Sequence, residues 1–256
     1  MPTFTLEQLI DAFDDVLAAT EALARPLSEA DGDRPTDCPG WTVKDQVAHM
    51  AGLEQIIGGA PAPEIELPEL AHVHGDTGRF MELSVHVRRG LPLVAVVDEL
   101  AGMRPRRVAE LRSLTAGGVD PLVPTPFGER PLSAGLPVRV FDLWAHEQDI
   151  RRALGQPPRI TGLGAAVSLD RVLAMWPRGL PQAVKGVDGE LAIEVTGPGP
   201  STTTITFGAG GPTATLRGDL GDVTRVFCGR VVPSDDLLTG DPALVDALRP
   251  KLGMTP

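Results

Sequence analysis

The chain has 256 residues, of which 42% are hydrophobic and 22% are charged, and these values are typical of a globular protein. Its formal net charge of −11 argues against nucleic-acid binding, which relies on clustered Lys and Arg. No apolar run is long enough for a membrane helix and no basic amphipathic helix suggests a membrane surface, so we expect a cytoplasmic protein. The two cysteines, Cys38 and Cys228, form no CxxC motif, which argues against disulfides and thiolate metal sites.

The first 155 residues have the periodicity of amphipathic helices. Apolar residues recur at spacings of three and four from Leu6 to Leu23. A second helix is predicted to begin after Thr42, which forms a variant of the capping box with Asp45, and to end at Gly58. Five helices of this kind predict a bundle. The other three are expected at about 76–89, 92–114 and 137–154, with a long loop at 117–137.

The character of the sequence changes after Gly155. Three short β-branched segments bounded by Gly and Pro predict antiparallel strands, with a hairpin turn at 208–212. We therefore expect an α+β fold in which residues 1–157 form an up-down helical bundle and 158–256 form a smaller domain with a short antiparallel sheet. The expected strands are 190–197, 201–208 and 212–219, and the expected helices are about 162–176, 220–230 and 241–252.

A polar stripe marks the predicted helix at 137–154. Four polar residues recur there at spacings of three and four, which places them on one face of the helix. Apolar residues border this face on both sides, so we expect the stripe to point into a cleft or the interior. The four residues are Arg139, Asp142, His146 and Asp149.

This stripe supplies two candidate metal ligands. Asp142 and His146 are four residues apart and can reach one cation from consecutive helical turns. A catalytic zinc takes three protein ligands, and His49, beside the apolar stripe of its own helix, is the natural third donor. A buried ion-pair network, with His49 as a hydrogen-bonded boundary residue, explains the same pattern. Composition does not separate the two interpretations.

Two neighbouring residues have competing interpretations. Glu54 lies one turn past His49 and is either a general base or partner of the site, or a helix-end residue where the bundle opens to water. Asp149 either orients His146 or a substrate, or pairs with Arg152. Trp41 is expected to contribute to the core.

Two segments resemble the mycothiol-dependent maleylpyruvate isomerase family: CPGWTVKDQVAHMAGLE at 38–54 and RVFDLWAHEQDIRRALG at 139–155. The C-terminal segment DLLTGDPALVDALRPKL resembles the second domain of that family. The resemblance implies a DinB-like metal-binding bundle followed by a domain similar to sterol-carrier folds. The zinc ligands of the family, a His on the second helix and a Glu and a His four apart on a later one, match His49, Asp142 and His146. Asp142 departs from this pattern because it is one methylene shorter than Glu.

The resemblance also implies a chemistry. Mycothiol, a low-molecular-weight thiol of actinobacteria, is the co-substrate in that family, and its metal-activated sulfur adds to an electrophilic carbon. We therefore expect the protein to bind a divalent ion, with zinc as the preferred ion. We expect its activity to be that of an isomerase or S-transferase acting on a small electrophile. Two alternatives stay open: a hydrolase or lyase that uses metal-activated water, and a non-catalytic binding module.

Arginines are the expected anchors for an anionic substrate, because guanidinium groups bind carboxylates bidentately. The candidates are Arg139 on the polar stripe and Arg225 and Arg230, which flank the segment VFCG. Surface salt bridging is the alternative for the last two. Because a bundle site open to water would not shield a reactive adduct, we also expect the second domain to wall one side of the metal cleft.

Overall fold

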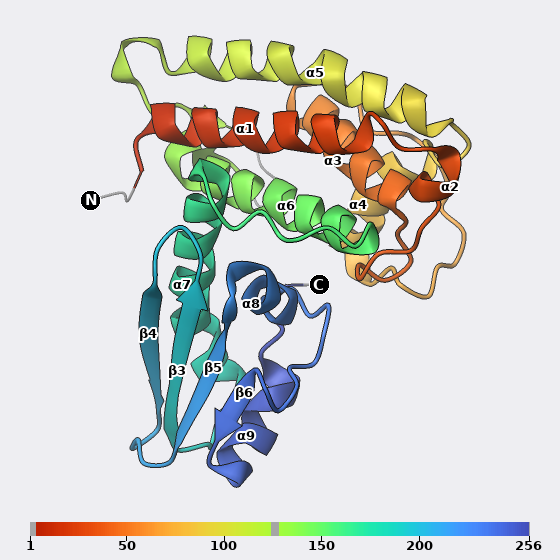
Figure 1. Ribbon diagram of the computed structural model, residues 1–256. Helices are drawn as coiled ribbons and strands as arrows, with labels where there is room; N and C mark the ends of the chain where they lie inside the picture. Colours follow the sequence, from red (N-terminus) through yellow and green to blue (C-terminus); the bar gives the residue numbers. More distant parts are fainter. Residues whose placement is uncertain (1–3, 124–127, 256) are drawn as a thin grey trace. The chain divides into compact units, whose positions relative to one another are not determined.

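The computed structural model describes residues 4–123 and 128–255, which form two compact units, Met1–Pro158 and Arg159–Pro256. The first unit is helical and the second contains a sheet (Figure 1). No helix among the described residues is long and apolar enough to cross a membrane. The elements of the first unit are α1 (Leu6–Ala24), α2 (Glu29–Gly32), α3 (Val43–Ile57), α4 (Gly75–His86), α5 (Leu93–Leu114), η1 (Ala116–Gly118), β1 (Leu122–Val123), β2 (Arg130–Pro131) and α6 (Leu132–Ala153).

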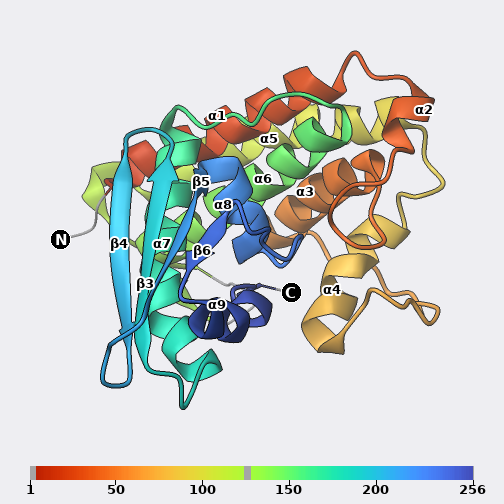
Figure 2. The same ribbon diagram turned by 60° about the horizontal axis from the view of Figure 1, so that its bottom comes forward.

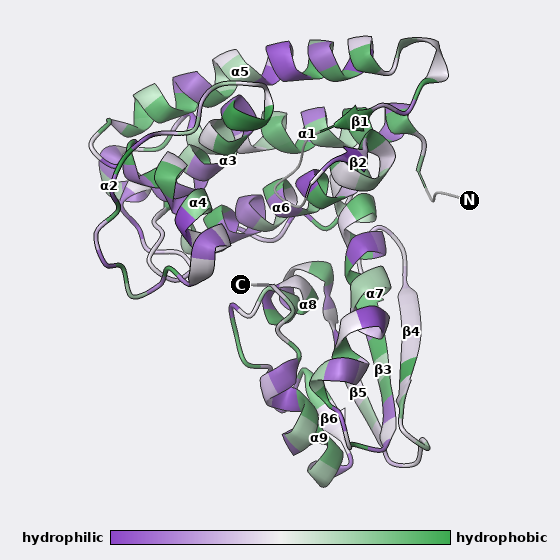
Figure 3. Ribbon diagram, turned by 180° about the vertical axis from the view of Figure 1, so that it is seen from behind, coloured by the Kyte–Doolittle hydropathy of each residue, from purple (hydrophilic) through white to green (hydrophobic). Residues whose placement is uncertain are grey.

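The long helices α1, α3, α5 and α6 form the bundle. Helices α1 and α3 each contact both α5 and α6, and α4 packs on α3. Hydrophobic and hydrophilic segments alternate along these helices (Figure 3), as expected where one face of each helix packs in the core. The predicted helical bundle is therefore confirmed. The largest fully buried side chains of this core include Phe13, Leu17, Met50, Leu100 and Trp144.

The start of α3 is fixed by local hydrogen bonds. The Thr42 hydroxyl accepts from the Asp45 backbone N–H at 3.2 Å, and the Asp45 carboxylate accepts from the Thr42 N–H at 3.0 Å, which confirms the predicted capping box. Gly52 lets α4 approach α3, because a Cβ at this position would lie 2.6 Å from the Ser84 Cβ. Together these contacts set the rotation of α3, and hence the direction in which His49 points.

Helix α6 begins five residues earlier than its sequence predicts. Pro137 is typical of a first helical turn, yet it lies inside the helix, which starts at Leu132. The Ser133 backbone N–H and hydroxyl donate to the Asp120 carboxylate at 2.9 and 2.6 Å, so a residue 13 positions away stabilises the helix start. Within the predicted loop, residues 124–127 lie outside the described residues.

The second unit places three helices against a mixed sheet (Figures 1 and 2). The strand order is β4-β3-β5-β6; β3 pairs antiparallel with β4 and parallel with β5, and β5 pairs antiparallel with β6. Helix α7 contacts β4, and α8 contacts β5 and β3. The elements are α7 (Leu163–Ala183), β3 (Gly189–Thr196), β4 (Ser201–Phe207), β5 (Thr213–Asp219), α8 (Leu220–Phe227), β6 (Leu238–Gly240), α9 (Pro242–Leu248) and η2 (Arg249–Lys251).

Two local predictions for this unit are wrong. Helix α7 continues through Pro177 and Pro181, because the fully buried Trp176 and Leu180 anchor the turns that the prolines interrupt. The segment 208–212 is not a hairpin turn, since β3 lies between β4 and β5. It instead crosses the end of β3, where the Ala209 N–H donates to the Asp188 carboxylate at 2.9 Å.

Candidate metal centre

Three side chains from two helices of the bundle meet at one point. The Nε2 atom of His49, on α3, lies 3.2 Å from Oδ2 of Asp142, on α6. The Nε2 atom of His146, one turn further along α6, lies 3.6 Å from the other carboxylate oxygen, Oδ1. Within residues 4–123 and 128–255, this is the one group of three or more His, Cys, Asp and Glu whose ligand atoms all lie within 4.8 Å of one another. The structure thus brings the three predicted ligands together.

The donor spacing fits a divalent ion. Two ligand atoms about 2.1 Å from a tetrahedral ion lie about 3.4 Å apart, which is between the two observed N–O distances. The imidazoles are almost fully buried, at 2% and 6% exposure, whereas 33% of the Asp142 side chain is exposed. Two nitrogens and one oxygen suit zinc and other first-row divalent ions, and three protein ligands leave a coordination position for a further ligand.

At neutral pH, two of the three candidate ligands are already in the protonation state that binds a metal ion. Burial lowers the pKa of His49 to about 4, so its imidazole is neutral. For Asp142, burial raises the pKa, but the nearby Arg139 and His146 outweigh burial and hold the pKa well below its usual value. For His146, burial lowers the pKa, but Asp142 and Asp149 outweigh it and the pKa is raised. Asp142 is therefore ionised and His49 is a free nitrogen donor.

Comparison with known proteins identifies the family. The model of the mycothiol maleylpyruvate isomerase N-terminal domain matches residues 13–151, a segment that contains all three predicted ligands. The chain belongs to this family. The resemblance predicted from the sequence is thus confirmed, although no curated protein matches the chain.

Two solved structures extend the similarity to the fold of nearly the whole chain. The crystal structure of the mycothiol-dependent maleylpyruvate isomerase has a TM-score of 0.64 and 19% sequence identity, covering 93% of each chain. The crystal structure of a single-residue mutant of that isomerase has a TM-score of 0.60 and 17% identity, with the same coverage. At these identities the similarity shows a shared fold.

A buried ion-pair network adjoins the centre in this member of the isomerase family. Arg139 donates from Nη1 to Asp142 Oδ2 and from Nε to Glu54 Oε1, both at 2.7 Å. The second Glu54 oxygen accepts from Arg107 Nε at 3.2 Å. Glu54 is 1% exposed, so the interpretation that it lies where the bundle opens to water is wrong. Because Glu54 accepts from both Arg107 and Arg139, it can hold Arg139 beside Asp142.

Asp149 lies behind His146. Its Oδ2 atom is 3.7 Å from His146 Nδ1, the ring nitrogen that does not face Asp142, and the residue is 4% exposed. A carboxylate next to the far nitrogen of a metal-binding imidazole is a common arrangement, because it fixes the ring orientation. Arg152, the alternative partner, has its Nε 3.2 Å from Asp37 Oδ2.

The other two predicted arginines lie in the second unit. Arg225 is in the last turn of α8, and Arg230 follows that helix and donates to the Cys228 carbonyl at 3.4 Å. Their assignment to substrate binding stays a prediction. The expectation that the second domain walls one side of the metal cleft also stays a prediction.

Sequence reasoning missed the role of Trp41. Its ring centroid lies 4.9 Å from that of His49 and 5.6 Å from that of His146, with interplanar angles of 40° and 36°. Trp41 precedes the extended N-cap residue Thr42 and so lies outside the helix of His49, and no helical spacing in the sequence indicates this contact.

Metal affinity is expected to fall below neutral pH in a stepwise manner. Because the pKa of His146 is raised and that of His49 is lowered to about 4, His146 gains a proton first as the pH falls. Between about pH 6 and pH 5 one proton should compete with each ion, which lowers the apparent affinity roughly tenfold per pH unit. Chelator competition over this range measures the slope. A slope of two protons per ion would show that both imidazoles titrate together and would contradict the assignment.

Proposed function

We propose that the protein is a metal-dependent, mycothiol-using isomerase or S-transferase that acts on a small electrophile. The observation that carries this proposal is the convergence of His49, Asp142 and His146 into a set of three donors with one accessible side. Membership of the mycothiol maleylpyruvate isomerase family supports the choice of thiol. Zinc is the preferred ion because two imidazoles and a carboxylate are its usual ligands in catalytic sites.

The chain supplies the setting for thiol activation. A bound divalent ion acts as a Lewis acid and lowers the pKa of a thiol at its open position. His49, neutral at pH 7, and the ionised Asp142 provide donors without first losing a proton. Asp149, beside His146 Nδ1, orients that imidazole, and the low exposure of both histidines keeps water from their side of the centre.

Arg139 is the proposed anchor for an anionic group of the substrate. Its Nε and Nη1 atoms are occupied by Glu54 and Asp142, and its Nη2 is a buried donor without a hydrogen-bond partner among the described residues. A buried donor left unpaired is costly, so a ligand oxygen that reaches it is favoured. We assign Glu54 the role of holding Arg139 in place. Arg225 and Arg230 are kept as candidates for the same kind of group.

Calorimetry with mycothiol tests the proposal. Wild-type protein loaded with zinc is titrated in buffers of different ionisation enthalpy, and the same titration is repeated on metal-free protein. We expect one proton to be released per thiol bound, because only the thiolate is a good metal ligand, and we expect tight binding to need the metal. S-methylated mycothiol, which has no proton to lose, is the matched control.

Each result of this titration has a distinct meaning. Proton release that depends on metal supports thiol activation. Binding that is equally tight without metal, or that releases no proton, would remove thiol activation and leave metal-activated water as the better nucleophile. An absence of mycothiol binding would favour a module without thiol chemistry.

A further inference from the structure

We propose that Trp41 is a positioning residue of the metal centre and that Glu82, on α4, holds its indole in place. The proposal rests on the proposed function in one respect, that His49, Asp142 and His146 bind a divalent ion. It assigns a role to α4, which supplies none of the three ligands.

The ring of His49 has no polar partner on its outer nitrogen. Its Nδ1 atom is buried and makes no hydrogen bond with the described residues. Metal-binding imidazoles usually donate this second N–H to a carboxylate, a carbonyl or water, and that bond sets the ring orientation. His146 Nδ1 likewise makes no hydrogen bond among the described residues, although Asp149 Oδ2 lies 3.7 Å from it. Apart from the contact of its Nε2 with Asp142 Oδ2 at 3.2 Å, the orientation of the His49 ring therefore depends on packing.

Trp41 provides this packing. Its indole, 9% exposed, lies against both imidazoles at centroid distances of 4.9 and 5.6 Å. Rotation of either ring away from Asp142 would push against the indole, so the contact restricts both Nε2 atoms to directions that face the carboxylate. The electron-rich indole face also suits imidazoles that become more positive when they bind a cation.

The indole is itself held by a buried acid. Trp41 Nε1 donates to Glu82 Oε2 at 2.9 Å, and the same oxygen lies 3.3 Å from His72 Nε2. The other oxygen, Oε1, lies 2.6 Å from Arg89 Nη1, and Arg89 Nε donates to Asp45 Oδ1 at 3.3 Å. Glu82 is 1% exposed. A buried carboxylate with several partners has one favoured position, so the donor that it accepts from is fixed as well.

The backbone before Trp41 is fixed from the same side. Gly40 has φ of +75°, a conformation that favours glycine, and a Cβ there would lie 2.2 Å from His72 Nδ1. The turn therefore packs directly on the His72 ring. His72, just before α4, therefore holds the backbone at Gly40, and Glu82, on α4, holds the indole of Trp41.

The test measures zinc affinity and cobalt absorption spectra of full-length variants. Trp41→Leu removes the ring, and we expect it to weaken zinc binding roughly 10–100-fold, the usual effect of losing a group that orients a ligand. Trp41→Phe keeps a ring but loses the hydrogen bond to Glu82, so a smaller loss is expected. Glu82→Gln leaves the indole intact and should act in the same direction. The visible spectrum of bound Co²⁺ reports ligand geometry and should shift in all three variants.

Trp176→Phe is the matched control. Trp176 is fully buried in the second unit, and its Nε1 donates to the Leu252 carbonyl at 2.9 Å, so the substitution deletes a similar hydrogen bond. Zinc affinity and the cobalt spectrum should stay at the wild-type values. Thermal unfolding of each variant in the metal-free form separates loss of folding from loss of ligand orientation.

The outcomes distinguish this inference from the proposed function. If wild-type protein binds no divalent ion, the proposed function fails and this inference fails with it. If wild-type protein binds one ion and Trp41→Leu binds it with unchanged affinity and an unchanged cobalt spectrum, this inference alone is overturned. If Trp41→Leu does not fold, the zinc affinities and cobalt spectra of Trp41→Phe and Glu82→Gln test this inference by the same criteria. Weaker binding with a shifted spectrum in these folded variants supports the positioning role.

Discussion

Replacing His146 with alanine is expected to abolish stoichiometric metal binding, and His49→Ala should do the same. Each substitution removes one of the three protein donors. Loss of a residue that only orients a ligand lowers metal affinity by up to roughly 100-fold, so loss of a ligand itself should lower the affinity by more. The two remaining donors cannot hold the ion against a chelator. Elemental analysis after dialysis against a zinc buffer of fixed free concentration measures the ion-to-protein ratio.

His86→Ala is the control for these two variants. His86 is a half-buried imidazole at the end of α4, and it does not belong to the group of three ligands. Its removal should leave the ratio at the wild-type value. Retention of metal by both His49→Ala and His146→Ala would place the ion elsewhere.

Replacing Glu54 with glutamine is expected to destabilise the first unit strongly. The carboxylate accepts from Arg107 and Arg139, and it is almost completely buried. Removing one partner of a buried ion pair costs about 3–5 kcal/mol, and we expect the lower end, about 3 kcal/mol, because each arginine keeps a second carboxylate, Glu110 or Asp142. Urea unfolding of metal-free protein, followed by tryptophan fluorescence, measures the change. A Trp176→Phe background restricts this signal to the first unit.

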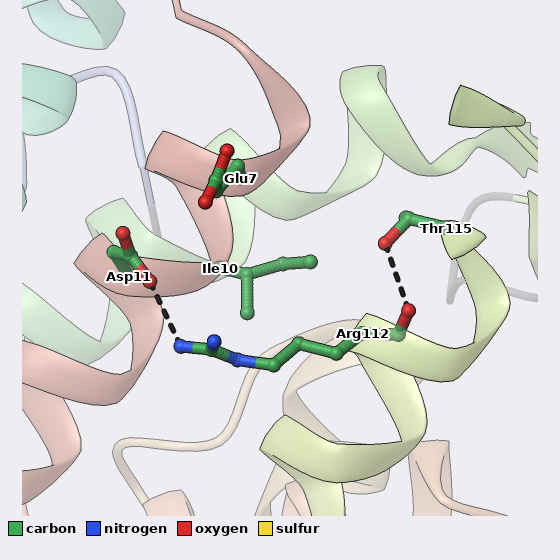
Figure 4. Close-up of a pocket in the computed structure, with 5 residues that line it drawn as sticks. All are labelled: Glu7, Ile10, Asp11, Arg112 and Thr115. Carbon is green, nitrogen blue, oxygen red and sulfur yellow. Dashed lines mark hydrogen bonds and ion pairs between the residues drawn. The ribbon is translucent and has the colours of Figure 1, made fainter. Parts of the chain in front are cut away.

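Asp11→Asn is the matched control for Glu54→Gln. Asp11 pairs with Arg112 at 3.0 Å between α1 and α5, and both side chains are about half exposed. Figure 4 shows this pair beside Glu7, Ile10 and Thr115, which line the same surface hollow. An exposed pair contributes about 0–1 kcal/mol, so the control should change stability little. If the two substitutions changed the free energy of unfolding equally, burial would not make the ion pairs of Glu54 more stabilising than the exposed pair of Asp11.

The pair of candidate ligands on α6 could be predicted from the sequence because its geometry is local. Asp142 and His146 are one helical turn apart, and apolar neighbours on both sides mark their face as buried. His49 could be added because it lies beside the apolar stripe of its own helix and because its segment resembles the mycothiol-dependent maleylpyruvate isomerase family.

The surroundings of the ligands could not be predicted in the same way because they depend on contacts between distant segments. Glu54 meets Arg107 and Arg139, which are 53 and 85 residues away, and no local pattern pairs them. Trp41 meets Glu82 across 41 residues. Likewise, the strand segments could be located from β-branched runs, but their order places β3 between β4 and β5 and follows from packing of the whole unit.

Anomalous X-ray diffraction at the zinc edge, from crystals of wild-type protein grown with zinc, tests the central claim most directly. We predict a single strong peak per chain, bounded by His49 Nε2, His146 Nε2 and the Asp142 carboxylate, at distances of about 2.0–2.2 Å from each. A featureless map at this position would contradict the claim. So would a peak bound by other residues while His49 and His146 keep their present contacts with Asp142. Either result would leave a buried ion-pair network as the explanation of the polar stripe.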